Sequence, residues 1–202
     1  MRSVLVVLAA IGVAMVVPAS RESFARSAEA FQGPRPLGIT NVTVIDVERG
    51  ARLRDQTVII EGGRISTVGP SSQVRVPDGY GVVPIPRIHV EGGTDRGGAV
   101  HVDSREQIPD GMVVHEELRR AVEGGLAPAA ALKALTVDAA RALEWQDHVG
   151  SVAPGRFGDL IILDANPLED IRNTTRINAI LVGGRFVDSD ERQRLLAGLA
   201  PR

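Results

Sequence analysis

From residue 39 onward, hydrophobic and polar positions alternate as they do in β-strands. The segment 39–50, ITNVTVIDVERG, is largely apolar on both faces of an extended chain. In the segment 57–69, TVIIEGGRISTVG, two apolar runs flank Gly62-Gly63, and such a pair predicts a β-hairpin with a two-residue turn. A short strand is expected from Tyr80 to Val83, where Pro84 ends it.

The period then changes to that of a helix. The segment 113–125, VVHEELRRAVEGG, places Val114, Leu118 and Val122 four residues apart and ends in a glycine pair. The segment 127–145, APAAALKALTVDAARALEW, predicts two helical pieces with a break near Thr136, and either Thr136 or Asp138 could cap the second piece.

Strand patterns return towards the C-terminus, in DLIILD (159–164), INAILVGG (177–184) and RFVD (185–188), and a polar helix is expected over 189–199. Strands at both chain ends surround the helices. We therefore predict an α+β fold in which the two ends pair into one sheet system, with the helical stretch inserted between them.

The N-terminal segment differs from the rest of the chain. Met1-Arg2-Ser3 precedes an apolar run over 4–17, and Pro18-Ala19-Ser20 follows it, which is the pattern of a secretory signal peptide. The run is shorter than the about 20 residues of a membrane span. We expect removal of the leader, export to the periplasm or the extracellular space, and no stable membrane insertion afterwards. The alternative is a chain anchored in the membrane by an uncleaved N-terminus.

Composition excludes several classes of site. The chain has no cysteine, so it has no disulfide framework, no cysteine-bound metal and no lipoprotein cysteine. Its net charge is −2 and its arginines are interspersed with acidic residues, so nucleic acid is not an expected partner. Aromatic residues make up only 3% of the chain, so the core must consist mainly of Val, Ile, Leu and Ala.

Three stretches carry a resemblance to a known family. The segments 115–145 and 150–187 resemble the C-terminal part of amidohydrolase-superfamily enzymes, above all the imidazolonepropionase-like and prolidase-like members. The segment 41–70 resembles their opening strands, and Gly92-Gly93-Thr94-Asp95 resembles the end of their eighth barrel strand. The resemblance extends from about residue 39 to residue 188.

This resemblance implies a β-sandwich built from both chain ends, the composite domain, beside a metal-dependent (β/α)8 barrel. Such enzymes hydrolyse carbon–nitrogen bonds, typically of small-molecule amides. A divalent metal, zinc above all, lowers the pKa of a bound water so that hydroxide forms near neutral pH. The family's aspartate at the end of strand eight binds the metal and takes the proton, and Asp95 matches that aspartate.

The departure from the family pattern concerns the barrel. A (β/α)8 barrel typically needs about 250 residues, yet only residues 84–91 separate the opening strands from the Gly92–Asp95 motif. No two histidines are two residues apart, so the family's His-x-His pair is absent, and its mid-barrel ligands have no counterpart. We therefore expect an internally truncated hydrolase that is inactive alone. The alternative is a non-catalytic, self-associating β-sandwich remnant, whose helices would expose the apolar stripe 114–122.

The candidate metal ligands lie close together in sequence. If residues 88–95 are extended, His89, Glu91 and Asp95 share one face, so His89 and Glu91 could help Asp95 to bind a metal, and His101-Val102-Asp103 follows. The alternative is that these are solvated loop residues, because one strand rarely surrounds a metal with tetrahedral geometry. We expect Asp95 to be a metal ligand without a tightly bound metal. His115 is expected to be a half-buried or surface histidine that binds no metal, and His148 has no assigned role.

These expectations divide the chain into five parts: a signal peptide and linker (1–30), the N-terminal half of the β-sandwich (31–86), a residual barrel strand with helices (87–150), the C-terminal half of the sandwich (151–188) and a C-terminal helix or tail (189–202).

Overall fold

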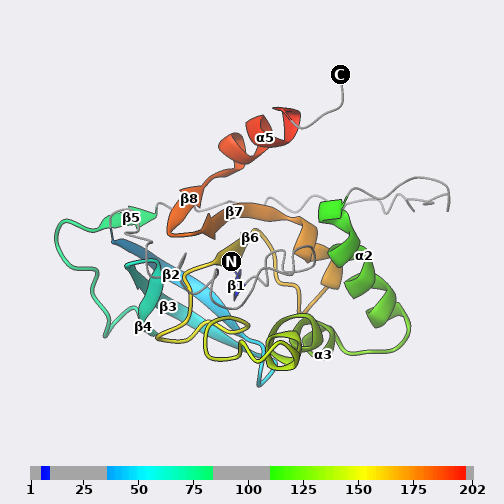
Figure 1. Cartoon of the computed structure of the whole chain (residues 1–202). Coiled ribbons are helices and arrows are strands. Elements are labelled where there is room, and N and C mark those ends of the chain that lie inside the picture. The colour runs from blue at the N-terminus through cyan, green and yellow to red at the C-terminus, as the bar shows by residue number, and fades with distance from the viewer. Residues whose placement is uncertain (1–5, 10–35, 84–109, 199–202) are drawn as a thin grey trace.

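Strands from both ends of the chain form one sheet (Figure 1). The structure is a computed structural model that describes residues 6–9, 36–83 and 110–198. Within these ranges the sheet has eight strands in the order β4-β3-β2-β1-β6-β7-β8, and β5 pairs with β2. Their bounds are β1 Val6–Ala9, β2 Leu37–Asp46, β3 Ala51–Glu61, β4 Arg64–Pro70, β5 Gly81–Val83, β6 Leu160–Leu163, β7 Ile177–Val182 and β8 Arg185–Val187.

Two glycine pairs form the tight turns of this sheet. Gly62 and Gly63 have φ angles of 55° and 74° and join β3 to β4, which confirms the predicted hairpin. Gly183 and Gly184 have φ angles of 54° and 71° and join β7 to β8 in the same manner. Two successive positive φ angles define the turn whose twist matches that of the flanking strands, and only glycine adopts them without steric cost.

The first strand comes from the apolar segment that the sequence predicts to be part of a signal peptide. Val6–Ala9 lies between the two halves of the sheet, parallel to β2 and antiparallel to β6. Removal of the leader and export stay predictions. In the parts of the chain that the structure covers, no helix combines the length and the hydrophobicity needed to cross a bilayer.

The apolar core is shared by the two ends of the chain. One cluster joins Ile39, Val58 and Ile65 of the N-terminal strands to Leu160, Ile162 and Leu181 of the C-terminal strands. This sharing confirms the predicted pairing of the chain ends and the α+β class. The predicted composite domain and the barrel remnant stay predictions.

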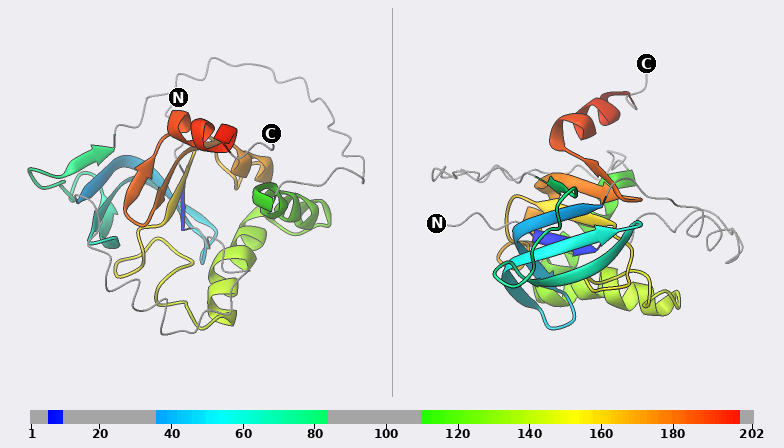
Figure 2. Two further views of the ribbon diagram at one scale, coloured as in Figure 1. Left: turned by 45° about the horizontal axis from the view of Figure 1, so that its top comes forward. Right: turned by 90° about the vertical axis from the view of Figure 1, so that its left-hand side faces the viewer.

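A second cluster joins the helices to the sheet. In Figure 2 the green helices lie together beside the strands. Ile45 and Val47, at the end of β2, and Leu163 of β6 pack against Leu118 and Leu132 from the helices. The helical elements are α2 Asp110–Glu123, α3 Pro128–Lys133, the π-helical turn η1 Ala134–Asp138, α4 Ala139–Ala142, the 3-10 helix η2 Ile171–Thr175 and α5 Ser189–Gly198.

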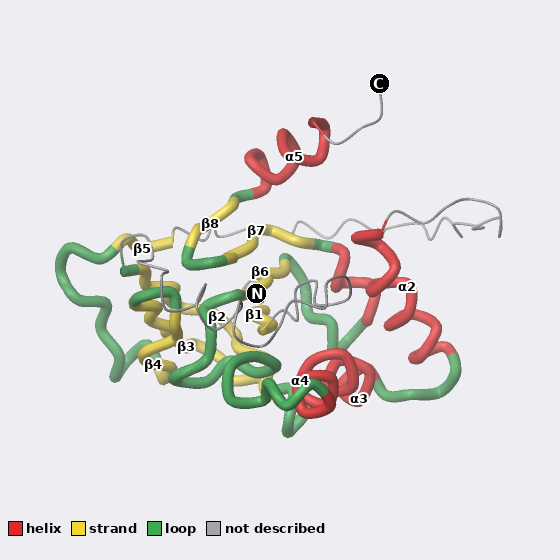
Figure 3. The backbone as a smooth tube through the Cα atoms, viewed as in Figure 1, coloured by secondary structure: helices red, strands yellow, loops and turns green. Residues whose placement is uncertain are grey.

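The two helical pieces predicted on either side of Thr136 are α3 and α4 (Figure 3). The chain stays helical between them, because a π-helical turn that contains Thr136 joins the two pieces. The Thr136 hydroxyl donates to the Leu132 carbonyl at 2.7 Å, and the Asp138 carboxylate accepts from Lys133 Nζ at 2.5 Å. Neither side chain caps a helix, because each has a partner on the same continuous helical run.

The expected exposure of the stripe 114–122 is also wrong at two of its three positions. Leu118 is 5% exposed and lies in the second core cluster, and Val122 packs against that cluster. Only Val114 is half exposed, at 50%. The physical reason is that α2 turns this stripe towards η2 and the end of the sheet. Self-association remains a prediction that rests on other exposed apolar residues, such as Leu195 and Leu196 on α5.

Candidate functional site

The candidate metal ligands of the sequence lie outside the described residues. This holds for Asp95, His89 and Glu91, and for His101 and Asp103. Within residues 6–9, 36–83 and 110–198, no three His, Asp or Glu side chains come close enough to share a metal ion. Asp95 as a metal ligand therefore stays a prediction.

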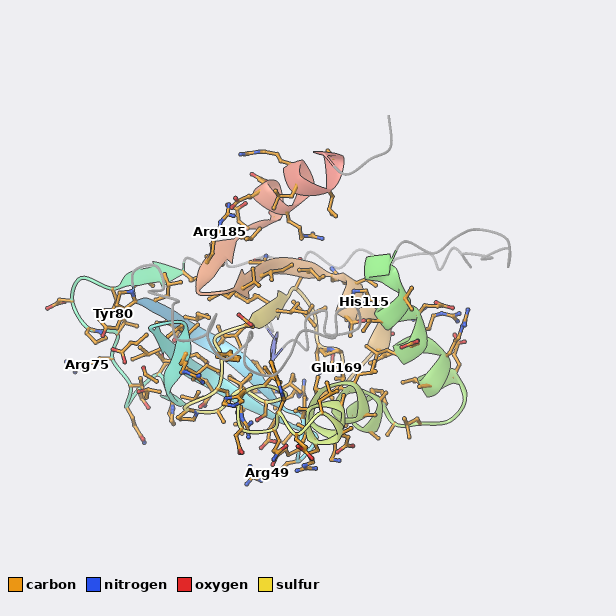
Figure 4. All side chains as sticks on the ribbon, viewed as in Figure 1. Arg49, Arg75, Tyr80, His115, Glu169 and Arg185 are labelled. Atoms are coloured by element: carbon orange, nitrogen blue, oxygen red, sulfur yellow. The ribbon has the colours of Figure 1, made fainter. Side chains whose placement is uncertain are left out.

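His115 is the described histidine nearest in sequence to the Gly92–Asp95 motif, and it lies on α2 facing η2 (Figure 4). Its Nδ1 is 3.1 Å from the Thr174 hydroxyl, which itself donates to the Ile171 carbonyl at 2.8 Å. Because the hydroxyl proton is already used, Nδ1 must donate and Nε2 carries the lone pair. Since α2 begins at Asp110, His115 lies more than one turn inside the helix.

The charge of His115 follows from its surroundings. Burial lowers the pKa of His115 below its usual value of 6.5, because the charged ring loses hydration. The ring is therefore neutral at pH 7 and half-buried, which confirms the expected half-buried histidine. A neutral imidazole that donates to a buried threonine has a structural role, since it ties α2 to η2.

This hydrogen bond predicts a difference in acid sensitivity. The unfolded chain takes up a proton at His115 near pH 6.5, whereas the folded chain does so only at lower pH. Stability is therefore lost as the pH falls below 6.5. We expect His115→Gln, which cannot titrate, to lose less stability between pH 7.5 and pH 5 than the wild-type chain does. Urea unfolding at both pH values measures this, and equal losses would contradict it. The carboxylates are the same in both proteins, so the difference isolates His115.

An acidic residue beside His115 is held in an ion-pair network on the same helix. Glu116 accepts from Arg119 Nε at 2.8 Å and from Arg120 Nε at 3.1 Å, and Arg119 also pairs with Glu123. The hydrogen bond from Arg119 is the main cause that lowers the pKa of Glu116 to about 2. Glu116 is thus ionised at every physiological pH, so it is unsuited to general acid catalysis, and its partners stabilise α2.

The segment Ala153–Asp159, APGRFGD, connects the two halves of the sheet. Gly155 N donates to the Ile65 carbonyl, Ile65 N donates to the Arg156 carbonyl and Gly158 N donates to the Gly63 carbonyl, each at 2.8 Å. Asp159 Oδ1 accepts from Gly183 N at 2.7 Å, which fixes the β7–β8 turn. These contacts give the segment a structural role, because they tie it to β4, to the β3–β4 turn and to the β7–β8 turn.

The aromatic residues around this segment complete the junction. The Arg64 guanidinium lies 4.4 Å from the centre of the Phe157 ring, and the His148 ring stacks on Phe157 at 5.7 Å between centroids. His148 therefore packs in the junction between the β4 side and the β6 side of the sheet. Arg52 and Glu169 form a further link, at 2.6 Å, between β3 and the loop before η2.

The segment Ala165–Asn173, ANPLEDIRN, forms a turn and the first part of the short helix η2. Asn166 Oδ1 accepts from Leu168 N at 3.1 Å, and Asn173 Nδ2 donates to the Asn166 carbonyl at 2.9 Å. Asp170 caps η2, since its carboxylate accepts from Arg172 N at 3.0 Å. The function of the turn is to place η2, and with it Thr174, against α2.

A family model described as "Amidohydrolase family" matches residues 87–187, which is half of the chain. The chain belongs to the amidohydrolase family. The match begins before the Gly92–Asp95 motif and extends through α2, the Ala153–Asp159 junction and β7 to the end of β8. It confirms the resemblance inferred from the sequence.

Adenine deaminases are among the curated relatives of this chain. A Bradyrhizobium adenine deaminase is 50% identical over 52 residues, which are 25% of this chain and 8% of the relative. A Jannaschia adenine deaminase is 42% identical over 55 residues, which are 27% of this chain and 9% of the relative. The aligned part of the chain thus spans less than a tenth of the length of these relatives.

One solved structure shares the fold over most of the chain. It comes from Bifidobacterium longum and is provisionally classed as a prolidase, with a TM-score of 0.54 and 13% identity. The match covers 82% of this chain and 99% of that one, so the matched chain is the shorter of the two.

Two features of the structure were missed from the sequence. The His115–Thr174 contact joins residues 59 positions apart, and no local pattern predicts such a pair. Strand β1 was missed because its residues also fit a signal peptide. The Gly92–Asp95 motif remains the sequence feature that points to catalysis.

Proposed function

We propose that this chain is the composite domain of an amidohydrolase that breaks carbon–nitrogen bonds in small molecules, and that the chain has no catalytic activity by itself. The observation that carries the proposal is the family match over residues 87–187, which includes Asp95. The adenine deaminases among the relatives support the type of bond, because deamination of adenine breaks a carbon–nitrogen bond.

The stretch between the opening strands and the Gly92–Asp95 motif is too short for a barrel. The chain passes from Val83, at the end of β5, to Gly92 through residues 84–91, which cannot hold seven barrel strands. The four histidines are His89, His101, His115 and His148, and no two of them form a His-x-His pair. A hydrolytic zinc site commonly needs three protein ligands and a water, and only Asp95 matches a family ligand.

We propose a metal cofactor for the complete enzyme and export for this chain. Zinc or another divalent metal would serve the complete enzyme, and this chain is proposed not to hold one tightly. Export to the periplasm or beyond is proposed from the apolar run 4–17. Self-association of a non-catalytic remnant remains the second candidate function, supported by the exposed apolar residues of α5.

Zinc titration of the purified chain tests the proposal. A lone carboxylate binds a divalent ion weakly, since it must displace the ion's water without the oriented ligands of a built site. We therefore expect Asp95→Asn to bind zinc with the same weak affinity as the wild-type chain in titration calorimetry. We also expect no zinc-dependent release of ammonia from adenine by either protein.

An exposed aspartate in the loop between β4 and β5 provides the matched control. Asp78→Asn removes the same charge at a position 17 residues before Asp95 and outside the motif, so it should leave the titration unchanged. Tight binding of one zinc ion by the wild-type chain and by Asp78→Asn, lost only in Asp95→Asn, would mean that Asp95 belongs to a true metal site. The proposal of inactivity would then be wrong.

A further inference from the structure

Strand β1 joins the two halves of the sheet. Each of its four residues has a partner on β6, from Val6 opposite Leu163 to Ala9 opposite Leu160. On its other side, Val6 and Val7 pair with Thr43 and Val44 of β2. The sheet order therefore runs from the N-terminal strands to the C-terminal strands through residues 6–9.

The strand edges on both sides of β1 are buried and, apart from Thr43 on β2, apolar. Val44 on β2 and Leu160, Ile162 and Leu163 on β6 are all buried, and they belong to the two core clusters. Without a strand between β2 and β6, the backbone groups that now face β1 would lose their partners next to this core. Buried backbone groups without partners are costly, and an open strand edge readily accepts another extended segment.

We propose that the gap between β2 and β6 is a binding site for a short, extended, apolar peptide strand, and that Val6–Ala9 of the same chain occupies it. The class of ligand follows from the neighbours. The paired residues of β2 and β6 include no charged side chain, so an apolar strand fits, and β6 has four residues, so a short strand suffices.

Pairing of β1 in the sheet conflicts with its use in export. Residues 6–9 lie inside the apolar run that forms the predicted signal peptide, so they cannot serve the sheet and the export machinery at the same time. A chain that has lost its leader would carry an open site, which would accept an apolar strand supplied from outside.

Amide exchange on the full, uncleaved chain provides the first test. We expect the amides of residues 6–9 to be protected as strongly as those of Leu160–Leu163, because both strands belong to one ladder. Exchange of residues 6–9 at the rate of an unstructured peptide would overturn the proposal. Protection of residues 6–9 found only in a dimer, as judged by sedimentation, would overturn the assignment to the same chain.

A pair of proline variants separates the strand from the leader. Proline cannot donate to a ladder and is excluded from central strands. We expect Val7→Pro to lower the melting temperature of the full chain by about 6–12 °C. Val13→Pro lies in the same apolar run but outside β1, and it should lower the melting temperature by less than about 2 °C. Equal melting temperatures for the two variants would contradict the proposal.

A synthetic peptide tests the site directly. The probe is residues 4–11, VLVVLAAI, with lysines added at both ends for solubility. We expect it to bind the Val7→Pro chain and to restore most of the lost melting temperature, and to leave the wild-type chain, whose site is filled, unchanged. The same peptide with proline at position 7 should have no effect. Equal responses to the two peptides would overturn the proposal.

Discussion

Replacement of Ile162 by alanine is expected to lower the free energy of unfolding by about 2–5 kcal/mol, the usual cost of removing most of a buried isoleucine side chain. Ile162 is 0% exposed and lies at the centre of β6. Its side chain belongs to the cluster that also contains Ile39, Val58 and Ile60 of the N-terminal strands. The cavity would therefore open within a core that both chain ends build.

The position of this core predicts where stability is lost. If the two ends of the chain fold as one unit, Ile162→Ala should weaken amide protection in Val58–Ile60 of β3 as strongly as in Leu160–Leu163 of β6. Urea unfolding gives the change in free energy, and amide exchange read by mass spectrometry gives its distribution. We expect one unfolding transition, lowered by about 10 °C in a thermal scan.

The matched control lies on the neighbouring strand. Val182, at the end of β7, is 54% exposed, so Val182→Ala removes a similar apolar group from the surface. Its effect should stay within about 0.5 kcal/mol. If Ile162→Ala instead reduced protection in Leu160–Leu163 while Val58–Ile60 kept theirs, the two halves would fold independently and the idea of a shared core would fail.

The strands could be predicted because their signals are local. The apolar runs on either side of Gly62-Gly63 belong to one short segment, and the turn needs two positive φ angles that glycine supplies. The same holds for α2, which ends at Glu123, directly before the glycine pair Gly124-Gly125. A pattern that is complete within about a dozen residues can be read without knowledge of the rest of the fold.

Strand β1 shows where prediction from a local sequence pattern fails. An unbroken apolar run fits a signal peptide, and part of it also fits a strand buried on both faces. Hydrophobicity alone does not separate these uses, because both environments select the same side chains. Val6–Ala9 of this run lie in the sheet between β2 and β6, and these two strands are formed by residues far away in the sequence.

The predicted cap at Thr136 or Asp138 is wrong for a different reason. Threonine is a weak helix former and a frequent cap, so Thr136 was a candidate to begin a new helix. In the structure the hydroxyl of Thr136 is satisfied by the Leu132 carbonyl, and Val137 and Ala140 are buried. Tertiary packing thus outweighs a local propensity that amounts to less than about 1 kcal/mol.

The candidate site could be predicted only as a motif. Asp95 was found because Gly92–Asp95 resembles a family sequence, and the family match over 87–187 includes it. Its surroundings lie outside the described residues, so its place as a ligand stays a prediction. The contact between His115 and Thr174 depends on how α2 meets η2, which no local sequence pattern determines.

Replacement of Gly158 by alanine is expected to destabilise the junction between the two halves of the sheet by about 1–3 kcal/mol, the usual cost of overpacking a core. A Cβ atom on Gly158 would lie 2.8 Å from Ile60 Cγ2 and 3.3 Å from Ile60 Cδ1. Ile60 is buried in the shared core, so it has no free space into which to move. Gly158 N also donates to the Gly63 carbonyl, so the backbone cannot withdraw without losing that bond.

Two further variants make this prediction specific. Gly198→Ala, at the end of α5, adds the same methyl group where no atom lies within 4 Å, so it should be neutral or slightly stabilising. In an Ile60→Ala background, the two atoms that would clash are absent, and we expect the cost of Gly158→Ala to fall close to zero. Residues in direct contact show such coupling, whereas independent sites add. If Gly158→Ala cost the same in both backgrounds, as measured by urea unfolding, the close approach of Gly158 to Ile60 would not be what this position requires.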